Sequence, residues 1–596
     1  LNGSMSMGSM GTAAGLTATF NGNVDATNSD IQLGFVSTAI DGANWSNLGS
    51  LRFEGTEIAV QNTIQSTGDQ TYVSTVNVVD NLTLDTGSGD LNISGPLLAT
   101  TAGTHDVNIN STGTAKIGGA VGNGTGSATT FFNGLTTNAG GTTEFSGNVV
   151  ALTQTFNDDI VLNGSMNMSG TTTNAGLSAT FNGQVDATNS TIQLGFVSTA
   201  IDGANWSNLA SLRFEGTDIG LQNTLQTTGD QTYIATNPVH LDGDTILVGE
   251  TLSIANGLDG QTKNLVLNFT QTTSLDGSFA NIADLTSEGD VSLNGSISTS
   301  GDQTYKADTI LSGDTNIVTS GGDVTITGGT GGIYSVEVLP AGIGYNLSIA
   351  AGAGNIIVGN ETGFGDKNGT AALVNNLSLS SSTSTKVGNG NQVISGDMNV
   401  PGGPLTLLGD ALLGGRSLMT PAGVDGAGHN LNLAFTEQTT IDGSFSNIKD
   451  LKSSFSVALE GTIVTSGYQE YSSSAVLVDN ATLQGTDLTF SNGLDGNAKN
   501  LDLNFSNTTF LNDDFANIAN LTSEGDVSLS GTITTSGGQN YKAAVNLADN
   551  TTLVGDSLSM ANGLDGQTKN LDLNFSQTTS LDGNFTNINN LISEGD

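Results

Sequence analysis

The chain has 596 residues, among them 82 glycines, six prolines and no cysteine, and hydrophobic residues make up 36% of it. A globular domain normally contains about 45–50% apolar residues, so one large core would be hard to fill, whereas a solenoid buries only a narrow interior in each coil. The net charge of −43, from 56 acidic and 13 basic residues, excludes nucleic acid as a partner and favours cations, above all calcium. No run of about 18 apolar residues occurs, so we expect no transmembrane segment.

The first predicted feature is a long internal repeat, and its first copy begins at residue 1. The stretch Ile31–Leu48 recurs letter for letter at Ile192–Leu209. A second family of copies begins at Asn256 and returns three more times, and its Leu265 strand aligns with the Ile192 strand of the first family. The two families are therefore one repeat, whose marker phenylalanine recurs at Phe35, Phe196, Phe269, Phe435, Phe505 and Phe575.

These copies predict one continuous repeat array over residues 1–596. We divide it into repeat copies at 1–72, 162–233, 234–305, 422–491 and 492–561, a partial copy at 562–596, an inserted block at 73–161 and a second inserted block at 306–421. The chain starts with LNGS and stops at SEGD, and internally the SEGD that ends at Asp290 is followed two residues later by LNGS. We therefore expect an excerpt from a longer array.

Within each copy, apolar and polar residues alternate over short runs such as Leu571–Phe575, which is strand periodicity. Gly, Asn and Asp interrupt these runs at fixed places, and these residues tolerate the positive φ of tight corners. The pattern predicts an all-β fold, a parallel β-helix (β-solenoid) with about three coils per 70-residue repeat. In it, Leu529, Leu553 and Leu573 would point inward and stack about one coil apart. Tandem small β-sandwich domains are the alternative fold.

The block from Val107 to Ser165 carries a family resemblance. Its turn Gly118–Gly122, the run LTTNAGGTT that begins at Leu135, and the recurring TGDQTY of Thr67–Tyr72 resemble giant repeat surface proteins. These proteins are related to filamentous haemagglutinins and autotransporter passengers, the β-helix exoproteins of Gram-negative bacteria. The resemblance implies a right-handed helix, export through the outer membrane, and an extracellular or cell-surface location. It also implies a role as an adhesin, in aggregation or in a surface filament, without supplying a ligand.

Trp45 and Trp206 are the first candidate binding residues, because an indole can stack on a sugar. The other copies have phenylalanine at the same position, for example Phe279, so we predict instead that both tryptophans fill the interior of the coil.

Paired carboxylates in the recurring Glu-Gly-Asp element are candidate calcium ligands. The residues are Glu288 and Asp290 in one copy and Glu524 and Asp526 in another. The three histidines, His105, His240 and His429, lie far apart in the sequence, so we expect no metal site from them. We expect no catalytic residues and no cofactor other than weakly bound calcium.

The repetition favours a non-catalytic structural or adhesive surface fibre for attachment or aggregation. Its expected partners are further copies of the chain, bound end to end or side by side, and a host surface or glycan. The alternative is a polysaccharide-processing β-helix enzyme, which needs Asp, Arg or Lys clustered in one groove. The 13 basic residues are scattered through the sequence, so we predict that the chain is not an enzyme.

Overall fold

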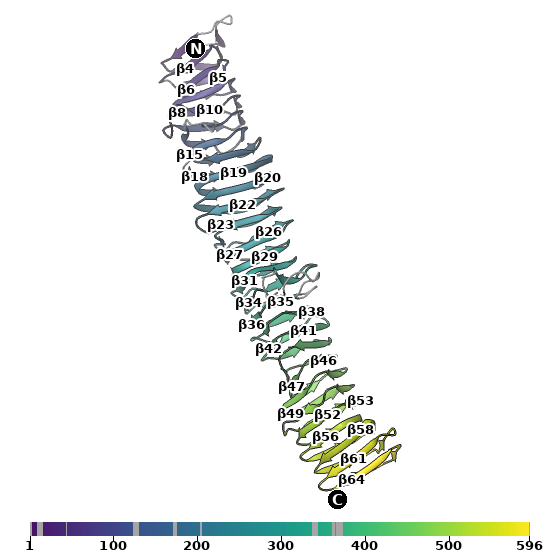
Figure 1. Cartoon of the computed structure of the whole chain (residues 1–596). Helices are drawn as coiled ribbons and strands as arrows, with labels where there is room; N and C mark the ends of the chain where they lie inside the picture. The colour runs from purple at the N-terminus through teal and green to yellow at the C-terminus, as the bar shows by residue number, and fades with distance from the viewer. Residues whose placement is uncertain are drawn as a thin grey trace. The chain divides into compact units, whose positions relative to one another are not determined.

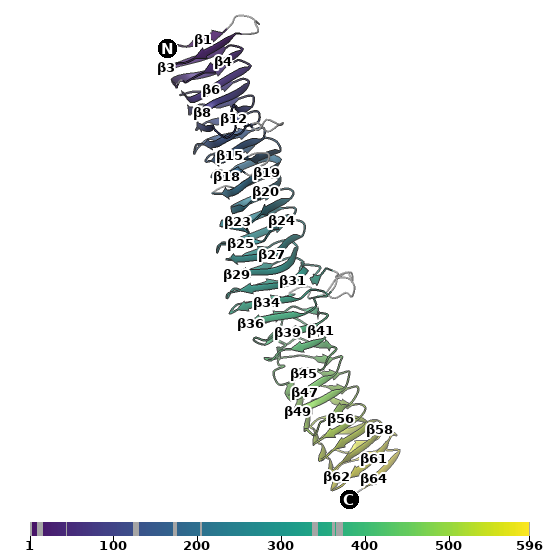
Figure 2. The ribbon, with the colours of Figure 1, turned by 60° about the vertical axis from the view of Figure 1, so that its left-hand side comes forward.

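The computed structural model describes residues 3–8, 16–42, 44–122, 130–170, 176–202, 205–336, 344–359, 364 and 373–594. Every regular element in these ranges is a β-strand, and these ranges contain no helix that could cross a membrane. The chain forms two compact units, Leu1–Asp290 and Val291–Asp596. In each unit the strands pair in parallel with partners about one coil further along the chain, as Figure 1 and Figure 2 show. The predicted parallel β-solenoid is confirmed, and the alternative of tandem sandwiches is wrong.

Each coil of the second unit contributes one strand segment to each of three stacks. The first stack contains β44 (Leu431–Phe435), β46 (Leu451–Ser453), β48 (Gln469–Tyr471), β50 (Leu488–Phe490), β53 (Thr508–Leu511), the first halves of β56 (Asp526–Thr535) and β58 (Val545–Gly555), and β60 (Leu564–Asp565).

The second stack contains the second halves of β47 (Val457–Val464) and β49 (Ala475–Gly485), then β52 (Leu501–Phe505), β55 (Leu521–Ser523), β57 (Gly538–Tyr541), β59 (Ser557–Met560) and β62 (Thr579–Leu581). The third contains the first halves of β47 and β49, then β51 (Leu494–Asp495), β54 (Phe515–Ile518), the second halves of β56 and β58, β61 (Asn570–Phe575) and β64 (Asn590–Glu594).

Alternate residues of each strand face the interior, because successive side chains in a strand point to opposite faces. Leu529, Leu553 and Leu573 are all buried, as predicted. Leu553 pairs with Leu573, but Leu529 pairs with Leu547 in the first stack and not with Leu553. The predicted stacking of Leu529 is therefore wrong, because a coil is closer to 20 residues than to 23 and its length varies from one turn to the next.

Side-chain amides connect successive coils at the corners, where backbone pairing stops. The backbone N–H of Asn500 donates to Oδ1 of Asn480 at 2.8 Å, and the side chain of Asn520 donates to Oδ1 of Asn500 at 2.9 Å. The N–H of Gly538 then donates to Oδ1 of Asn520 at 2.9 Å. The oxygens of Asn480 and Asn520 thus accept backbone N–H groups that have no strand partner at the corner.

The 70-residue repeat of the second unit does not fit a whole number of coils. Between the Leu431 strand and the equivalent Leu501 strand, the chain adds eleven strand segments: three for each of three complete turns and two more. Equivalent strands therefore fall in different stacks: β44 in the first, β52 in the second and β61 in the third. Each copy makes three turns and two-thirds, so it is turned by a third of a turn relative to the copy before it.

In the first unit, equivalent strands of the repeat also fall in different stacks, and a later copy falls again in the stack of the first. Pairing from residue to residue leads from Ile31 in β3 (Val24–Gly34) through eleven successive partners to Leu267 in β26 (Leu265–Phe269). Strands β3 and β26 are equivalent strands of the repeat and share one stack, whereas the equivalent Ile192 strand belongs to another stack, paired with Leu212. The coil continues through the block at 73–161, which therefore does not interrupt the solenoid.

Cysteine pairs will test this register, since the chain has no cysteine of its own. Thr552 and Asp572 face outward and pair in neighbouring coils, about 4.8 Å apart by strand spacing, within the Cα separation of about 4.4–6.8 Å that a disulfide requires. The double variant T552C/D572C should oxidise to an intramolecular disulfide. The variant S528C/T552C, which joins strands 24 residues apart, should stay reduced, as measured by gel mobility and thiol titration. The opposite result would contradict the register.

Candidate functional site

Six copies of the repeat share a short segment with an aromatic residue, an asparagine two positions later, and then Ile or Leu. The aromatic residues are Trp45, Trp206, Phe279, Phe445, Phe515 and Phe585. Trp45 and Trp206 are 1% and 0% exposed, and Trp206 packs edge to face on Phe181 with ring centroids 4.8 Å apart. The predicted interior position is confirmed, so neither indole can stack on a sugar. Both indole N–H groups are buried without a partner, which suits the replacement by phenylalanine in other copies.

The asparagine of this segment was missed by the sequence analysis. It adopts positive φ in all six copies, between 52° and 55°, at Asn47, Asn208, Asn281, Asn447, Asn517 and Asn587. In five copies its side chain donates to an aspartate of the preceding coil at 3.0–3.1 Å, as Asn517 does to Asp495. A constant Asp-to-Asn spacing of 22 residues is the signal that could have revealed it.

The recurring Gln-x-Tyr of the TGDQTY type is a structural motif of the interior. Gln539 donates from Nε2 to the carbonyls of Ile533 at 3.0 Å and Val554 at 2.9 Å, and Tyr541 donates its hydroxyl to Gln539 Oε1 at 3.0 Å. The same bonds recur at Gln70, Gln231, Gln303 and Gln469. Burial raises the pKa of the Tyr541 hydroxyl, so it stays a neutral donor.

The Glu-Gly-Asp elements form corners of the coil. A side chain at Gly525 would lie 2.0 Å from the carbonyl oxygen of Phe505, and one at Gly289 would lie 2.2 Å from that of Phe269. Glu524 pairs with Lys542 at 2.5 Å, and Asp526 accepts the N–H of Ala544 at 3.1 Å.

The candidate calcium ligands Glu288, Asp290, Glu524 and Asp526 are thus placed at corners that need the glycine for close approach. Across the described ranges, no three His, Cys, Asp or Glu side chains gather as a metal site. Calcium binding stays a prediction.

Each histidine lies beside an aspartate of a neighbouring coil. His240 lies between Asp218 and Asp242, with N–O distances of 3.3 Å to both. His105 is 4.0 Å from Asp80, and His429 is 3.8 Å from Asp410. The structure does not bring the three histidines together.

Among the residues that the structure describes, one carboxyl group is buried. Asp158 is 3% exposed, and the hydroxyls of Thr137 and Thr143 donate to its two oxygens, the second at 2.6 Å. Desolvation by burial raises the pKa of Asp158, although both hydroxyl bonds favour the ionised form.

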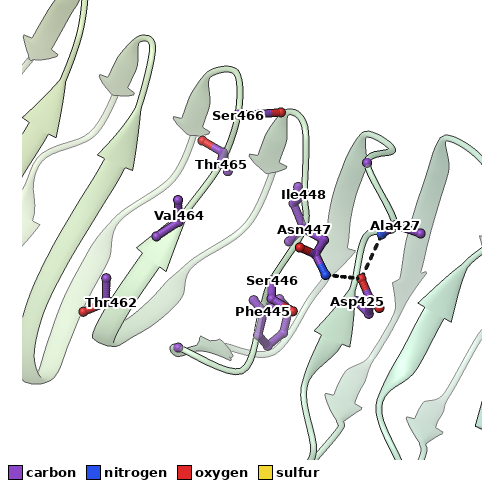
Figure 3. A pocket seen from close by; sticks show the side chains of 12 residues that line it. Asp425, Ala427, Phe445, Ser446, Asn447, Ile448, Thr462, Val464, Thr465 and Ser466 are labelled. Carbon is purple, nitrogen blue, oxygen red and sulfur yellow. Dashed lines mark hydrogen bonds between the residues drawn. The ribbon is translucent and has the colours of Figure 1, made fainter.

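A surface hollow of about 640 Å³ interrupts the second unit in the copy at 422–491. Its walls include Asp425, Phe445, Asn447, Thr462 and Val464 (Figure 3). Figure 3 shows Asp425 bonded to the side chain of Asn447, with Thr462 and Val464 on the strand across the opening. Among the residues that line the hollow, Asp425 contributes a carboxylate and Val464 an exposed apolar side chain.

Comparison with known proteins identifies no relative: no family model, no curated protein and no solved structure matches the chain.

Removing the interior glutamine should destabilise its coil. Gln539→Leu loses two hydrogen bonds to backbone carbonyls and leaves the Tyr541 hydroxyl without an acceptor, so we expect the local free energy of opening to fall by about 2–4 kcal/mol. Adding Tyr541→Phe removes the orphaned hydroxyl and should restore about 1 kcal/mol. Hydrogen exchange of the neighbouring coils measures both effects. Faster exchange throughout the chain would contradict the local role, since coils contact only their neighbours.

The buried Asp158 predicts a local pH dependence. Its pKa is raised above the usual 3.8 in the folded chain, so the native state binds more protons and this coil becomes more stable as pH falls through the folded pKa towards 3.8. Asp158→Asn removes this titration. Between pH 7 and pH 4, hydrogen exchange should therefore slow around residues 137–160 in the parent chain relative to the variant. An identical pH response in both proteins would show that Asp158 does not titrate there.

Proposed function

We propose that the chain is a non-catalytic structural and adhesive fibre of a bacterial cell surface, of the kind formed by haemagglutinin-like exoproteins. The observation that carries the proposal is the phase of the repeat. Because each copy is turned by a third of a turn, equivalent side chains of β44, β52 and β61 lie in three different stacks. The surface of the repeat is therefore presented on different sides of the coil in successive copies. This arrangement suits repeated weak contacts with other molecules on every side.

The polar residues also support a structural role. The asparagines, glutamines and threonines that recur in the copies of the repeat make coil-to-coil hydrogen bonds, as Asn517 and Gln539 do. Lysines pair with acids of adjacent coils, for example Lys452 with Glu470 at 2.8 Å. A polysaccharide-processing enzyme would concentrate such groups in one groove, so this second function is less well supported.

The net charge shapes how copies associate. At −43 the surfaces of two copies repel each other, and raising the ionic strength from about 0.01 M to about 1 M shortens the screening length from about 30 Å to about 3 Å. Side-by-side association should therefore increase with salt. Since equivalent surfaces lie in all three stacks, the assemblies should grow as bundles rather than as flat single-layer sheets.

Bead assays will test the proposal. Beads coated with the chain should aggregate increasingly as salt rises, should adhere to cells or glycan-coated surfaces, and should release no reducing ends from acidic or neutral glycans. Electron microscopy of the free chain at high salt should show bundles. A chain that stays monomeric at every salt concentration and adheres to nothing would refute the fibre, and release of reducing ends would favour the enzyme.

A further inference from the structure

Three aromatic side chains are exposed on the surface of the second unit. Phe455, Tyr468 and Phe510 are 41%, 39% and 38% exposed, and no other aromatic side chain in the described ranges is as accessible. All three lie within the four successive coils that contain β46, β48, β50 and β53. A single exposed ring needs no explanation, whereas rings that gather on one face indicate a contact surface.

Two of these rings, Tyr468 and Phe510, replace small polar residues of the repeat. Tyr468 precedes the Gln-x-Tyr motif at the position that Asp302 occupies in an earlier copy. Phe510 stands where that copy has Ser274. Asp302 and Ser274 are both exposed. The coil therefore forms with a small polar side chain at either position, and neither ring is required for the fold.

The strand register places both rings on the outer face of the first stack. Glu470 pairs with Thr489, and Thr489 pairs with Phe510, in three successive coils. Tyr468 lies two residues before Glu470 and is aligned with the preceding coil, since its carbonyl accepts the N–H of Leu451 at 3.0 Å. Its Cα is thus about 12 Å from that of Phe510, across two coils and two residues. We call the outer surface of the first stack from Tyr468 to Phe510 the aromatic face.

The next copy carries an equivalent face without rings. Gly538 and Ser580 take the places of Tyr468 and Phe510, and they lie in the second stack. Both line a surface hollow of about 360 Å³. The strands of this equivalent face pair in register, as those of the aromatic face do. The rings of Tyr468 and Phe510 are therefore additions to a coil that is complete without them.

The charged groups beside the two rings are already paired. Lys452 donates from Nζ to Glu470 at 2.8 Å, and the Ser472 hydroxyl donates to the same carboxylate oxygen at 3.0 Å. Asp487, in the coil between the rings, accepts a hydrogen bond from the Asn507 side chain at 3.2 Å. The charge of Lys452 is thus neutralised by Glu470, so the aromatic face does not attract an anion.

We infer that the aromatic face binds a neutral oligosaccharide of pyranose rings, an inference that rests on the proposed adhesive function and gives it a ligand and a site. A pyranose ring presents C–H groups on its flat face, and these pack on an aromatic ring. Its hydroxyls lie at the edge, where the hydroxyls of Tyr468 and Thr489 can donate or accept hydrogen bonds. A short sugar chain that spans the surface contacts both rings and presents its hydroxyls to the polar side chains between them.

Charge and area distinguish this ligand from a protein or an acidic glycan. The chain carries a charge of −43, so a second copy or an acidic polysaccharide is repelled. A stable protein interface buries about 800 Å² on each partner around a continuous apolar centre. The aromatic face instead has two rings about 12 Å apart with the polar Thr489 and Glu470 between their coils. This alternation matches the apolar faces and polar edges of a sugar chain.

Calorimetric titration of the full chain with chitohexaose will test the site, and binding should be saturable. Phe510→Ser and Tyr468→Asp copy the residues of the earlier copy, and each should weaken binding at least about tenfold through loss of one ring contact. Tyr468→Phe keeps the ring and should stay within about threefold of the parent. The matched control Phe455→Ser removes an exposed ring at the corner after β46, outside the aromatic face, and should leave the affinity unchanged. Hydrogen exchange of the first stack will show that each variant is folded.

Bead assays separate this inference from the proposed function. Beads coated with Tyr468→Asp/Phe510→Ser should lose adhesion to a chitohexaose-coated surface and still aggregate with salt as the parent does. If parent beads aggregate and adhere to cells but chitohexaose does not bind, or binds the double variant equally well, the glycan site is wrong and the fibre stands. Binding of a heparin hexasaccharide in place of chitohexaose would also overturn the site. Beads that neither aggregate nor adhere while chitohexaose binds the parent alone would refute the fibre and keep the site.

Discussion

The fold depends on giving the backbone N–H groups at each corner an acceptor in the neighbouring coil. Strand segments satisfy one another through parallel pairing, but a corner bends the backbone out of register, and a buried N–H without a partner is costly. Asparagine and aspartate oxygens take that place: Asn480 accepts the N–H of Asn500, and Asn520 accepts the N–H of Gly538. Interior glutamines do the same for carbonyls, as Gln539 does for Val554. The abundant polar residues are therefore part of the scaffold.

The same requirement explains why the repeat can be out of phase with the coil. A hydrogen bond such as that from Asn517 to Asp495 needs only the right residue one coil earlier, and it recurs in five copies of the repeat. A repeat of eleven strand segments therefore continues smoothly although each copy starts in a different stack. The result is a surface that repeats around the coil, with a rise of about 18 Å per copy from the strand spacing. Side chains that recur in β44, β52 and β61 therefore lie in three different stacks.

One surface hollow shows how local a departure from the regular coil is. The hollow lies beside Phe445 in the copy at 422–491, while the Gln-x-Tyr motif one turn later remains intact at Gln469. Because each coil contacts only its neighbours, a departure in one copy stays in that copy. The solenoid can thus contain a local irregularity without losing its continuity.

The sequence by itself determined the parallel β-solenoid, the equivalence of the two repeat families and the interior position of Trp45 and Trp206. These follow from apolar alternation and from the exchange of Trp with Phe between copies, both of which are local signals. It did not determine the stacking of Leu529. The coils differ in length, so a single average number of residues per coil does not predict which residues pair. The turn of each copy by a third, and the hollow beside Phe445, were decided only by the tertiary structure. Both depend on which residues of adjacent coils lie opposite each other. This register is set by the geometry of every corner that lies between them in the chain.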